Sequence, residues 1–264
     1  MSIIEKAIER LEDEPLDDPT DRVIEGAEVE QPLSEPALEE SSVDVVGAEP
    51  STEPAVTTNE SPKPRTWREV ELDLAALKSA GIVTPELENT VLAEQYRLIK
   101  RPLLMQANAA GESTARSNLI MVGSAIPGEG KTHTAVNLAM SIAMERDRTV
   151  LLVDGDVSKA DVNRVLGFRG EEGLSDYLVN EGDDLSNYLV RTNIPKLQIL
   201  PSGRRHPNLT ELLAGPDMKR LAAELSERYA DRIVIFDSPP LLATSGASVL
   251  ATLVGQIVLV VEAI

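Results

Sequence analysis

Residues 125–132 have the sequence AIPGEGKT, and they lie between an apolar run at 119–122 and a helical pattern at 134–144. A strand, a glycine-rich turn and a helix N-terminus in this order form a cradle for phosphate, because backbone N–H groups and the helix dipole both attract an anion. In such a cradle Lys131 contacts the β- and γ-phosphates, and the Thr132 hydroxyl is placed to ligate Mg²⁺. The pattern therefore predicts a P-loop, in which an alanine replaces the usual first glycine.

Aspartates follow two apolar runs that read as buried strands. The run at 150–153 leads into Asp154 and Asp156, and the run at 233–236 leads into Asp237. A carboxylate that is buried without a partner costs free energy, and beside a P-loop that partner is Mg²⁺, held directly or through water. An aspartate that caps the following turn is the alternative interpretation of each position alone. Two such strand ends beside one P-loop favour the nucleotide site.

The elements that must position these residues alternate between strands and helices, as in a parallel sheet. Strands are expected at 119–124, 150–154, 197–201, 233–237 and 257–262. Helices are expected at 68–80, 85–101, 132–146, 173–180, 208–214, 216–229 and 245–253. The strands are almost wholly aliphatic, as a sheet covered by helices on both faces requires. We therefore predict an α/β P-loop NTPase fold with a mostly parallel sheet, whose ligands bind beyond the carboxyl ends of the strands.

Charge is distributed unevenly along the chain. The formal net charge is −19, and residues 13–62 carry fifteen acidic residues, one arginine, seven prolines and no aromatic residue. Such a segment cannot bury enough apolar surface to offset the entropy of ordering, so we expect an acidic disordered linker at 13–64. The folded domain is expected at 65–264. The acidity of the linker argues against nucleic acid as its partner.

The N-terminal residues 1–12 form an amphipathic helical pattern, with apolar side chains on one face and charged side chains on the other. A helix this short is marginal on its own, so it either packs on the main domain or docks on a partner. Cysteine is absent, which fits a reducing cytosol. No apolar run approaches the ~20 residues of a membrane span, and the N-terminus does not read as a signal peptide. We therefore expect a cytoplasmic chain with no membrane span of its own.

Several segments resemble the bacterial tyrosine kinases, which are P-loop proteins unrelated to the eukaryotic protein kinases. These segments are the loop at 127–132, the strand end DGD at 154–156 and the strand end FDSPP at 236–240. The stretches at 1–11, 94–101 and 200–207 are similar to the subgroup associated with exosortase and exopolysaccharide loci. The similarity covers most of the predicted domain and the N-terminal helix, and none of the acidic linker.

The resemblance implies a protein-tyrosine autokinase that uses ATP and Mg²⁺ as cofactors. Lys131, Asp154, Asp156 and Asp237 are the implied catalytic residues, and Asp154 orients or deprotonates a tyrosine hydroxyl, whose pKa of ~10 calls for such help. Mg²⁺ is held by Thr132, Asp156 and Asp237. The residues implied to bind the nucleotide are Pro127, Gly128, Glu129, Gly130, Lys131, Thr132 and His133.

The resemblance also implies partners. Glu94, Arg97 and Lys100 match the E-x-x-R-x-x-R oligomerisation pattern of the family, with lysine in the last place, so a homo-oligomer is expected. A role in exopolysaccharide biosynthesis and export implies a membrane polysaccharide co-polymerase, the chain-length determinant, which recruits the chain to the inner membrane. No nucleic acid partner is implied.

The C-terminal end departs from the pattern of the family. Those kinases phosphorylate a C-terminal tyrosine cluster, whereas the tyrosines here are scattered, at Tyr96, Tyr177, Tyr188 and Tyr229. The chain also ends directly after a predicted strand, where the fold usually adds another helix and strand. We therefore expect a domain that is truncated on its C-terminal side.

Two other functions stay open. In a partition or septum-positioning (ParA- or MinD-like) ATPase switch, a second lysine five residues before Lys131 reaches across a dimer; Ile126 occupies that place and counts against this function. A non-catalytic nucleotide-binding scaffold for a membrane partner is the third interpretation. Arg204 and Arg205, in the loop that follows the strand at 197–201, face either phosphate or solvent.

Overall fold

The computed structural model describes residues 68–263 except 88, 110–115, 158, 171, 181 and 228–231. The chain divides into two units, 1–59 and 60–264, and the first unit contains no described residue. The predicted helix at 1–12 and the predicted linker at 13–64 therefore lie outside the described residues. All that follows concerns the second unit.

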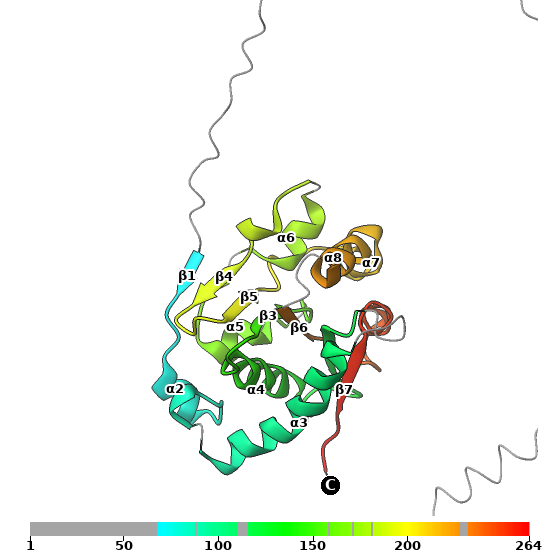
Figure 1. Ribbon diagram of the computed structural model, residues 1–264. Coiled ribbons are helices and arrows are strands. Elements are labelled where there is room, and N and C mark those ends of the chain that lie inside the picture. Colours follow the sequence, from blue (N-terminus) through cyan, green and yellow to red (C-terminus); the bar gives the residue numbers. More distant parts are fainter. Residues whose placement is uncertain are drawn as a thin grey trace, which may run out of the picture. The chain divides into compact units, whose positions relative to one another are not determined.

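The second unit is built on one seven-stranded sheet with the strand order β1-β4-β5-β3-β6-β2-β7 (Figure 1). The strands are β1 (Arg68–Val70), β2 (Leu119–Ser124), β3 (Thr149–Asp154), β4 (Val190–Thr192), β5 (Leu197–Leu200), β6 (Arg232–Asp237) and β7 (Gln256–Val260). Five of the strands run parallel to one another: β5, β3, β6, β2 and β7. Strand β4 is antiparallel to β5, and β1 pairs with β4 in parallel, so β1 and β4 run opposite to the other five. The prediction of a mostly parallel sheet is confirmed.

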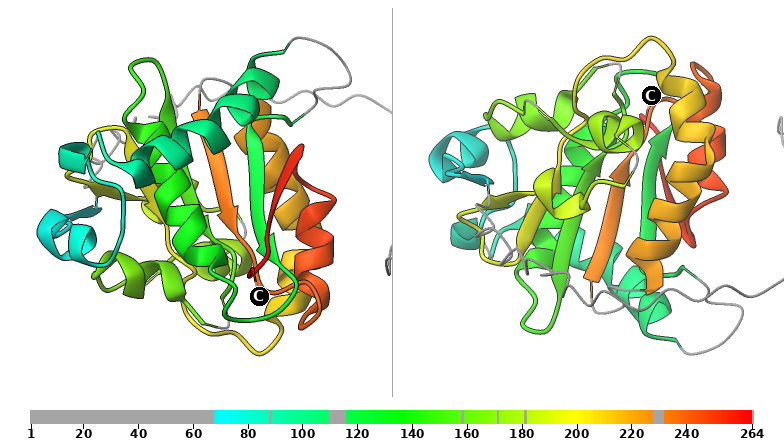
Figure 2. Two further views of the ribbon diagram at one scale, coloured as in Figure 1. Left: turned by 90° about the horizontal axis from the view of Figure 1, so that it is seen from below. Right: turned by 90° about the horizontal axis from the view of Figure 1, so that it is seen from above.

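Helices cover both faces of this sheet, as Figures 1 and 2 show. They are α2 (Leu74–Ser79), α3 (Val91–Asn108), α4 (Lys131–Ala143), α5 (Asp161–Leu166), α6 (Leu174–Val179), α7 (Leu209–Ala214), α8 (Pro216–Glu227) and α9 (Ser245–Ala251), with 3-10 turns η1 (Pro85–Leu87) and η3 (Leu185–Asn187). Side chains alternate between the faces of a strand. In β2, Ile120 and Val122 accordingly pack with α2–α5, and Leu119 and Met121 pack with α6–α9.

The N-terminal part of the domain differs from the sequence prediction. The helix expected at 68–80 is wrong at its start, because residues 68–70 form strand β1 and helix α2 begins only at Leu74. Asp73 sets that start, since its side chain accepts hydrogen bonds from the N–H groups of Ala75 and Ala76. The helix expected at 85–101 begins as η1, and α3 then runs on to Asn108.

Candidate nucleotide-binding site

The P-loop connects the buried strand β2 to helix α4, which begins at Lys131. Gly128 and Gly130 have φ angles of 100° and 94°, a left-handed conformation that glycine adopts without steric cost. The Glu129 carboxylate accepts a hydrogen bond of 2.8 Å from the Ile126 N–H, which closes the loop on itself. The two glycines and the Glu129 contact therefore fix the turn of the loop. The first N–H groups of α4 have no partner within the helix and point out of its N-terminus.

Lys131 lies among the strand-end aspartates. Its Nζ is 2.9 Å from Asp156 Oδ2 and 3.9 Å from Asp237 Oδ1, and the lysine side chain is only 6% exposed. The sheet register explains the proximity of residues far apart in sequence, because Asp154 at the end of β3 pairs with Asp237 at the end of β6. The Gly155 N–H donates a 2.8 Å hydrogen bond to the Asp237 carbonyl and ties the two strand ends together.

The two strand-terminal carboxyl groups are buried and lack hydrogen-bond donors. The carboxyl oxygens of Asp154 and Asp237 accept no hydrogen bond of ordinary geometry, and both residues are fully buried. Burial raises the pKa of Asp154 well above its usual range, and the negative charges of Asp237 and Asp156 raise it further. Burial also raises the pKa of Asp237, to about 7, against the opposing effects of Lys131 and the Thr132 hydroxyl.

The charge of Lys131 is maintained by its neighbours. Burial lowers the pKa of the Lys131 ammonium group, but the carboxylates of Asp237 and Asp156 outweigh burial and leave that pKa raised. Lys131 is therefore a buried cation at neutral pH, and it is held beside the place where the P-loop offers its N–H groups to phosphate.

The donor set fits a cation that shares its ligands with phosphate. Within the described part of the chain, no group of three or more acidic or histidine side chains forms a metal cage. Mg²⁺ in nucleotide sites is held by one or two carboxylates, substrate phosphates and water rather than by a protein cage. The unsatisfied oxygens of Asp237 and the Thr132 hydroxyl provide donors of this kind.

The structure does not gather every predicted site residue around the loop. The His133 ring points toward the segment that follows α2, where its Nε2 is 3.3 Å from the Ala80 carbonyl oxygen. Its Nδ1 is 3.1 Å from Asn137 Nδ2. Contact between His133 and a nucleotide would therefore come from its backbone N–H. Pro127 and Glu129 lie in the turn itself, and Glu129 is already engaged by Ile126.

The three residues predicted to mediate oligomerisation do not share one face of α3. Glu94 and Arg97 form an ion pair of 2.8 Å on the outer face of α3. Lys100 instead turns inward, where its Nζ is 2.6 Å from Glu145 Oε1 and donates a 2.7 Å hydrogen bond to the Ser141 carbonyl. Lys100 therefore fastens α3 to the P-loop helix α4.

One residue that supports the site was missed from the sequence. Asn137 is fully buried in α4. Its Oδ1 accepts a 2.7 Å hydrogen bond from the Val83 N–H, and its Nδ2 donates to the His133 carbonyl. The signal was a polar side chain in an otherwise apolar stretch of that helix. Asn137 joins the segment between α2 and α3 to the first turns of the P-loop helix.

Comparison with known proteins adds independent information. Residues 117–262 match a family model described as an AAA domain. The chain is 35% identical over 170 residues to the tyrosine-protein kinase YwqD of Bacillus subtilis, covering 64% of this chain and 68% of that protein. It is 34% identical over 146 residues to the tyrosine-protein kinase wzc of Salmonella typhimurium, covering 55% of this chain and 20% of that protein. The chain belongs to the bacterial tyrosine kinase family.

Solved structures agree with this membership. The kinase domain of the Escherichia coli tyrosine kinase ETK superposes with a TM-score of 0.58 at 27% identity, covering 70% of this chain and 80% of that one. The chimerical protein CapA2B2 also gives a TM-score of 0.58, at 26% identity, covering 74% and 79% of the two chains. The P-loop fold and the family predicted from the motifs are thus confirmed. The chain spans about two thirds of YwqD and about a fifth of wzc.

Proposed function

We propose that this chain binds Mg²⁺·ATP and transfers the γ-phosphoryl group to a tyrosine hydroxyl. The observation that carries the proposal is the position of Lys131, buried between Asp156 and Asp237 at the N-terminus of the P-loop helix. A site with one cation, two unsatisfied buried carboxyl groups and a row of N–H groups is suited to a polyphosphate that brings its own divalent cation.

The roles of the residues follow from their surroundings. Lys131 and the backbone of Gly128–Thr132 bind and orient the phosphates, and the bound Mg²⁺ would neutralise charge that develops between the β- and γ-phosphates. Thr132, Asp237 and Asp156 are the proposed holders of that cation. Asp154 is the proposed acceptor of the tyrosine hydroxyl proton as the new P–O bond forms, because its raised pKa makes the ionised carboxylate a stronger base.

We also propose that the chain forms homo-oligomers through the outer face of α3. A groove of about 400 Å³ runs along this helix and is lined by Glu94, Arg97 and Leu98 among others. Leu98 is 66% exposed, so an apolar contact is available beside the ion pair. The proposed role in exopolysaccharide biosynthesis, and recruitment to the inner membrane by a polysaccharide co-polymerase, rest on the resemblance of the motifs. No helix among the described residues combines the length and the apolar character that crossing a membrane requires.

Labelled ATP separates the three candidate functions. The purified chain is incubated with [γ-³²P]ATP, Mg²⁺ and a tyrosine-containing peptide, alongside Lys131→Met and Asp237→Asn. We expect phosphotyrosine that depends on Lys131 and disappears with EDTA, with a loss of at least about 100-fold in each variant, since each removes a contact to the transferring phosphoryl group. Lys78→Met, at an exposed position on α2, is the matched control and should retain full activity.

The other outcomes have defined meanings. Release of inorganic phosphate without phosphotyrosine would identify an ATPase switch and contradict the kinase proposal. Binding of a fluorescent ATP analogue without turnover would identify a scaffold. Either result in the unmodified chain would overturn the proposal directly.

A further inference from the structure

The loop that follows β5, residues 201–206, is held rigidly at the edge of the sheet that carries the P-loop. Strand β5 pairs with β3, whose end leads into Asp154 and Asp156, so the loop lies next to the proposed catalytic aspartates. The Leu174 N–H donates a 2.8 Å hydrogen bond to the Pro201 carbonyl, and the Ser175 N–H donates one of 3.0 Å to the Ser202 carbonyl. The loop is therefore fastened to the start of α6.

Side-chain hydrogen bonds from α6 also hold this loop in place. Asp176 is buried, and its Oδ2 accepts hydrogen bonds from the N–H groups of Arg204, at 3.0 Å, and of Gly173, at 2.9 Å. The Ser175 hydroxyl donates a 2.7 Å hydrogen bond to the Arg204 carbonyl. A Cβ atom on Gly173 would lie 2.0 Å from the Pro201 carbonyl oxygen, which only glycine permits. These contacts define the direction in which the rest of the loop leaves the sheet.

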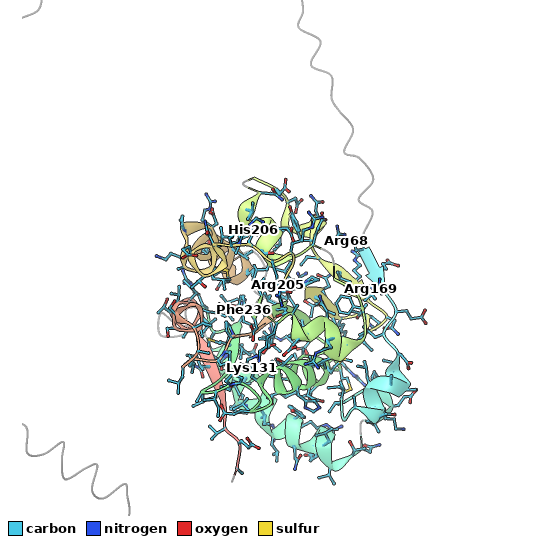
Figure 3. All side chains as sticks on the ribbon, turned by 180° about the vertical axis from the view of Figure 1, so that it is seen from behind. Arg68, Lys131, Arg169, Arg205, His206 and Phe236 are labelled. Carbon is cyan, nitrogen blue, oxygen red and sulfur yellow. The ribbon has the colours of Figure 1, made fainter. Side chains whose placement is uncertain are left out.

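Basic side chains gather on this fastened loop and beside it. We call the pair Arg169 and Arg205 the basic rim; both are exposed. Arg169 belongs to it because the next residue, Gly170, packs directly against Pro201. In the view of Figure 3, Arg169, Arg205, His206 and Arg68 lie on one side of Phe236, with Lys131 on the other.

Two acidic residues of this region, Glu172 and Asp176, lie beside other arginines. Glu172 accepts a 2.9 Å contact from the Arg204 guanidinium and also pairs with Arg68. Asp176 Oδ1 is 3.8 Å from Arg204 Nε. Arg204 and Arg68 therefore lie beside these carboxylates. The two arginines of the basic rim are further exposed cations of this region, in a chain that is acidic overall, with a net charge of −19.

We propose that the basic rim binds acidic residues that flank the acceptor tyrosine, so that the acceptor of this chain is an acidic polypeptide segment. The proposal rests on the proposed kinase function. A tyrosine that reaches Asp154 must approach over this edge of the sheet, because ligands of such folds bind beyond the carboxyl ends of the strands. An extended peptide advances ~3.3 Å per residue, so residues only a few positions from the tyrosine reach the rim. Charge complementarity then steers and orients the acceptor.

Binding of two matched peptides tests the proposal without turnover. One fluorescein-labelled peptide carries a single tyrosine between four glutamates on each side, and the other carries glutamines in their place. Anisotropy with the full chain and ADP should give tighter binding of the glutamate peptide, weakened by added salt. Arg169→Ala and Arg205→Ala should each raise its Kd about fivefold, and the double variant about 25-fold, as expected for exposed charge pairs of ~1 kcal/mol each. The Kd of the glutamine peptide should not change.

The control is Arg146→Ala, an exposed arginine in the turn before β3 and thus at the opposite edge of the sheet. It should leave both Kd values unchanged. Equal binding of the two peptides would contradict the proposed binding of acidic residues by the basic rim. An equal effect of Arg146→Ala and Arg205→Ala on the Kd of the glutamate peptide would contradict it as well. Loss of binding of a fluorescent ADP analogue in the rim variants would also overturn it, because the rim would then contact nucleotide.

Failure of the rim and failure of the kinase function are distinguishable. If the kinase function holds and the rim does not, both peptides are phosphorylated with the same KM. If the rim binds acidic residues but the chain is not a kinase, the glutamate peptide binds in a manner that depends on Arg205 but is not phosphorylated.

Discussion

At the scale of single residues, the site is organised by how far each carboxylate lies from one lysine. Asp156 Oδ2 is 2.9 Å from Lys131 Nζ, Asp237 Oδ1 is 3.9 Å from it, and Asp154 forms no ion pair with it. Burial raises the pKa of Asp154 well above its usual range, where the neighbouring carboxylates raise it further, whereas Lys131 partly opposes the effect of burial on the pKa of Asp237.

Asp237→Asn should stabilise the nucleotide-free chain at alkaline pH. A carboxyl group with a pKa of about 7 in the folded state and ~3.9 in the unfolded state binds more protons when folded. Its contribution to stability is therefore largest at low pH, falls as pH rises from about 4 to about 7, and stays low above that. The asparagine variant lacks this loss, so its free energy of unfolding should exceed that of the parent by about 1–3 kcal/mol at pH 8 and equal it near pH 4.

Urea denaturation between pH 4 and pH 8 without nucleotide or Mg²⁺ measures this difference. Part of the pH dependence should persist in the variant, because burial also raises the pKa of Asp154. Asp147→Asn, at an exposed position in the turn before β3, is the control and should follow the parent at every pH. A variant with the same slope as the parent would show that Asp237 is ionised throughout.

At the scale of elements, the strands next to the site were predictable and the peripheral ones were not. Strand β2 was predicted at its observed bounds, because an apolar run ends at a glycine-rich turn there. Strand β1 was read as helix. It is three residues long and gains its hydrogen bonds from β4, more than a hundred residues away, so the local sequence carries no signal for it. Strand β4 is equally short and was also missed, although its antiparallel partner β5 follows closely in the sequence.

Helix α3 shows how packing outweighs a local stop signal. The prediction ended at residue 101, directly before Pro102, yet the helix continues through Pro102 to Asn108. Proline removes one backbone hydrogen bond, but Leu103 and Leu104 beyond it pack on the core. The Gln256 side chain also donates a 3.0 Å hydrogen bond to the Leu103 carbonyl. Such tertiary gains are absent from a sequence pattern.

Lys100→Ala and Arg97→Ala should affect different properties of the chain. Lys100 is buried, and its removal leaves Glu145 and the Ser141 carbonyl without that cation, so the free energy of unfolding should fall by about 1–3 kcal/mol. Arg97 pairs with Glu94 at the surface, where a pair is worth ~0.2–1 kcal/mol. Arg97→Ala should therefore barely change stability, and it should reduce oligomerisation if α3 is the interface.

Urea denaturation and light scattering after gel filtration measure the two effects separately. Lys78→Ala, at an exposed position on α2 outside the groove, provides a control for loss of surface charge. A marked stability loss in Arg97→Ala together with an unaffected Lys100→Ala would contradict the division of roles.

At the scale of the whole molecule, the sequence identified the parts of the site and left their mutual geometry open. Lys131, Thr132, Asp154 and Asp237 could be assigned because each stands at a strand end or a helix start. The direction of a side chain within an element could not. Whether Lys100 faces solvent or α4 depends on how two helices meet, and this is a property of the packed structure rather than of the spacing.

The tyrosines of the described domain are mostly buried, which bears on where phosphate is placed. Tyr96 and Tyr188 are 7% and 4% exposed. The Tyr188 hydroxyl donates a 2.5 Å hydrogen bond to Asp183 Oδ2, and its ring packs edge-on against Tyr177 at 5.9 Å between centroids. Tyr177 is half-buried, and Tyr229 lies outside the described residues. A phosphoryl group cannot reach a buried hydroxyl without local unfolding.

Mass spectrometry of the chain after incubation with ATP and Mg²⁺ should therefore find no phosphate on Tyr96 or Tyr188. Tyr96→Phe and Tyr188→Phe should leave the yield of phosphotyrosine on an added peptide unchanged, whereas Tyr188→Phe should lower the free energy of unfolding by about 0.5–1.5 kcal/mol because its hydrogen bond to Asp183 is lost. A synthetic peptide covering residues 183–193 is the control: its phosphorylation would show that burial, and not the surrounding sequence, protects Tyr188. Phosphate on either buried tyrosine in the folded chain would mean that the domain opens during the reaction.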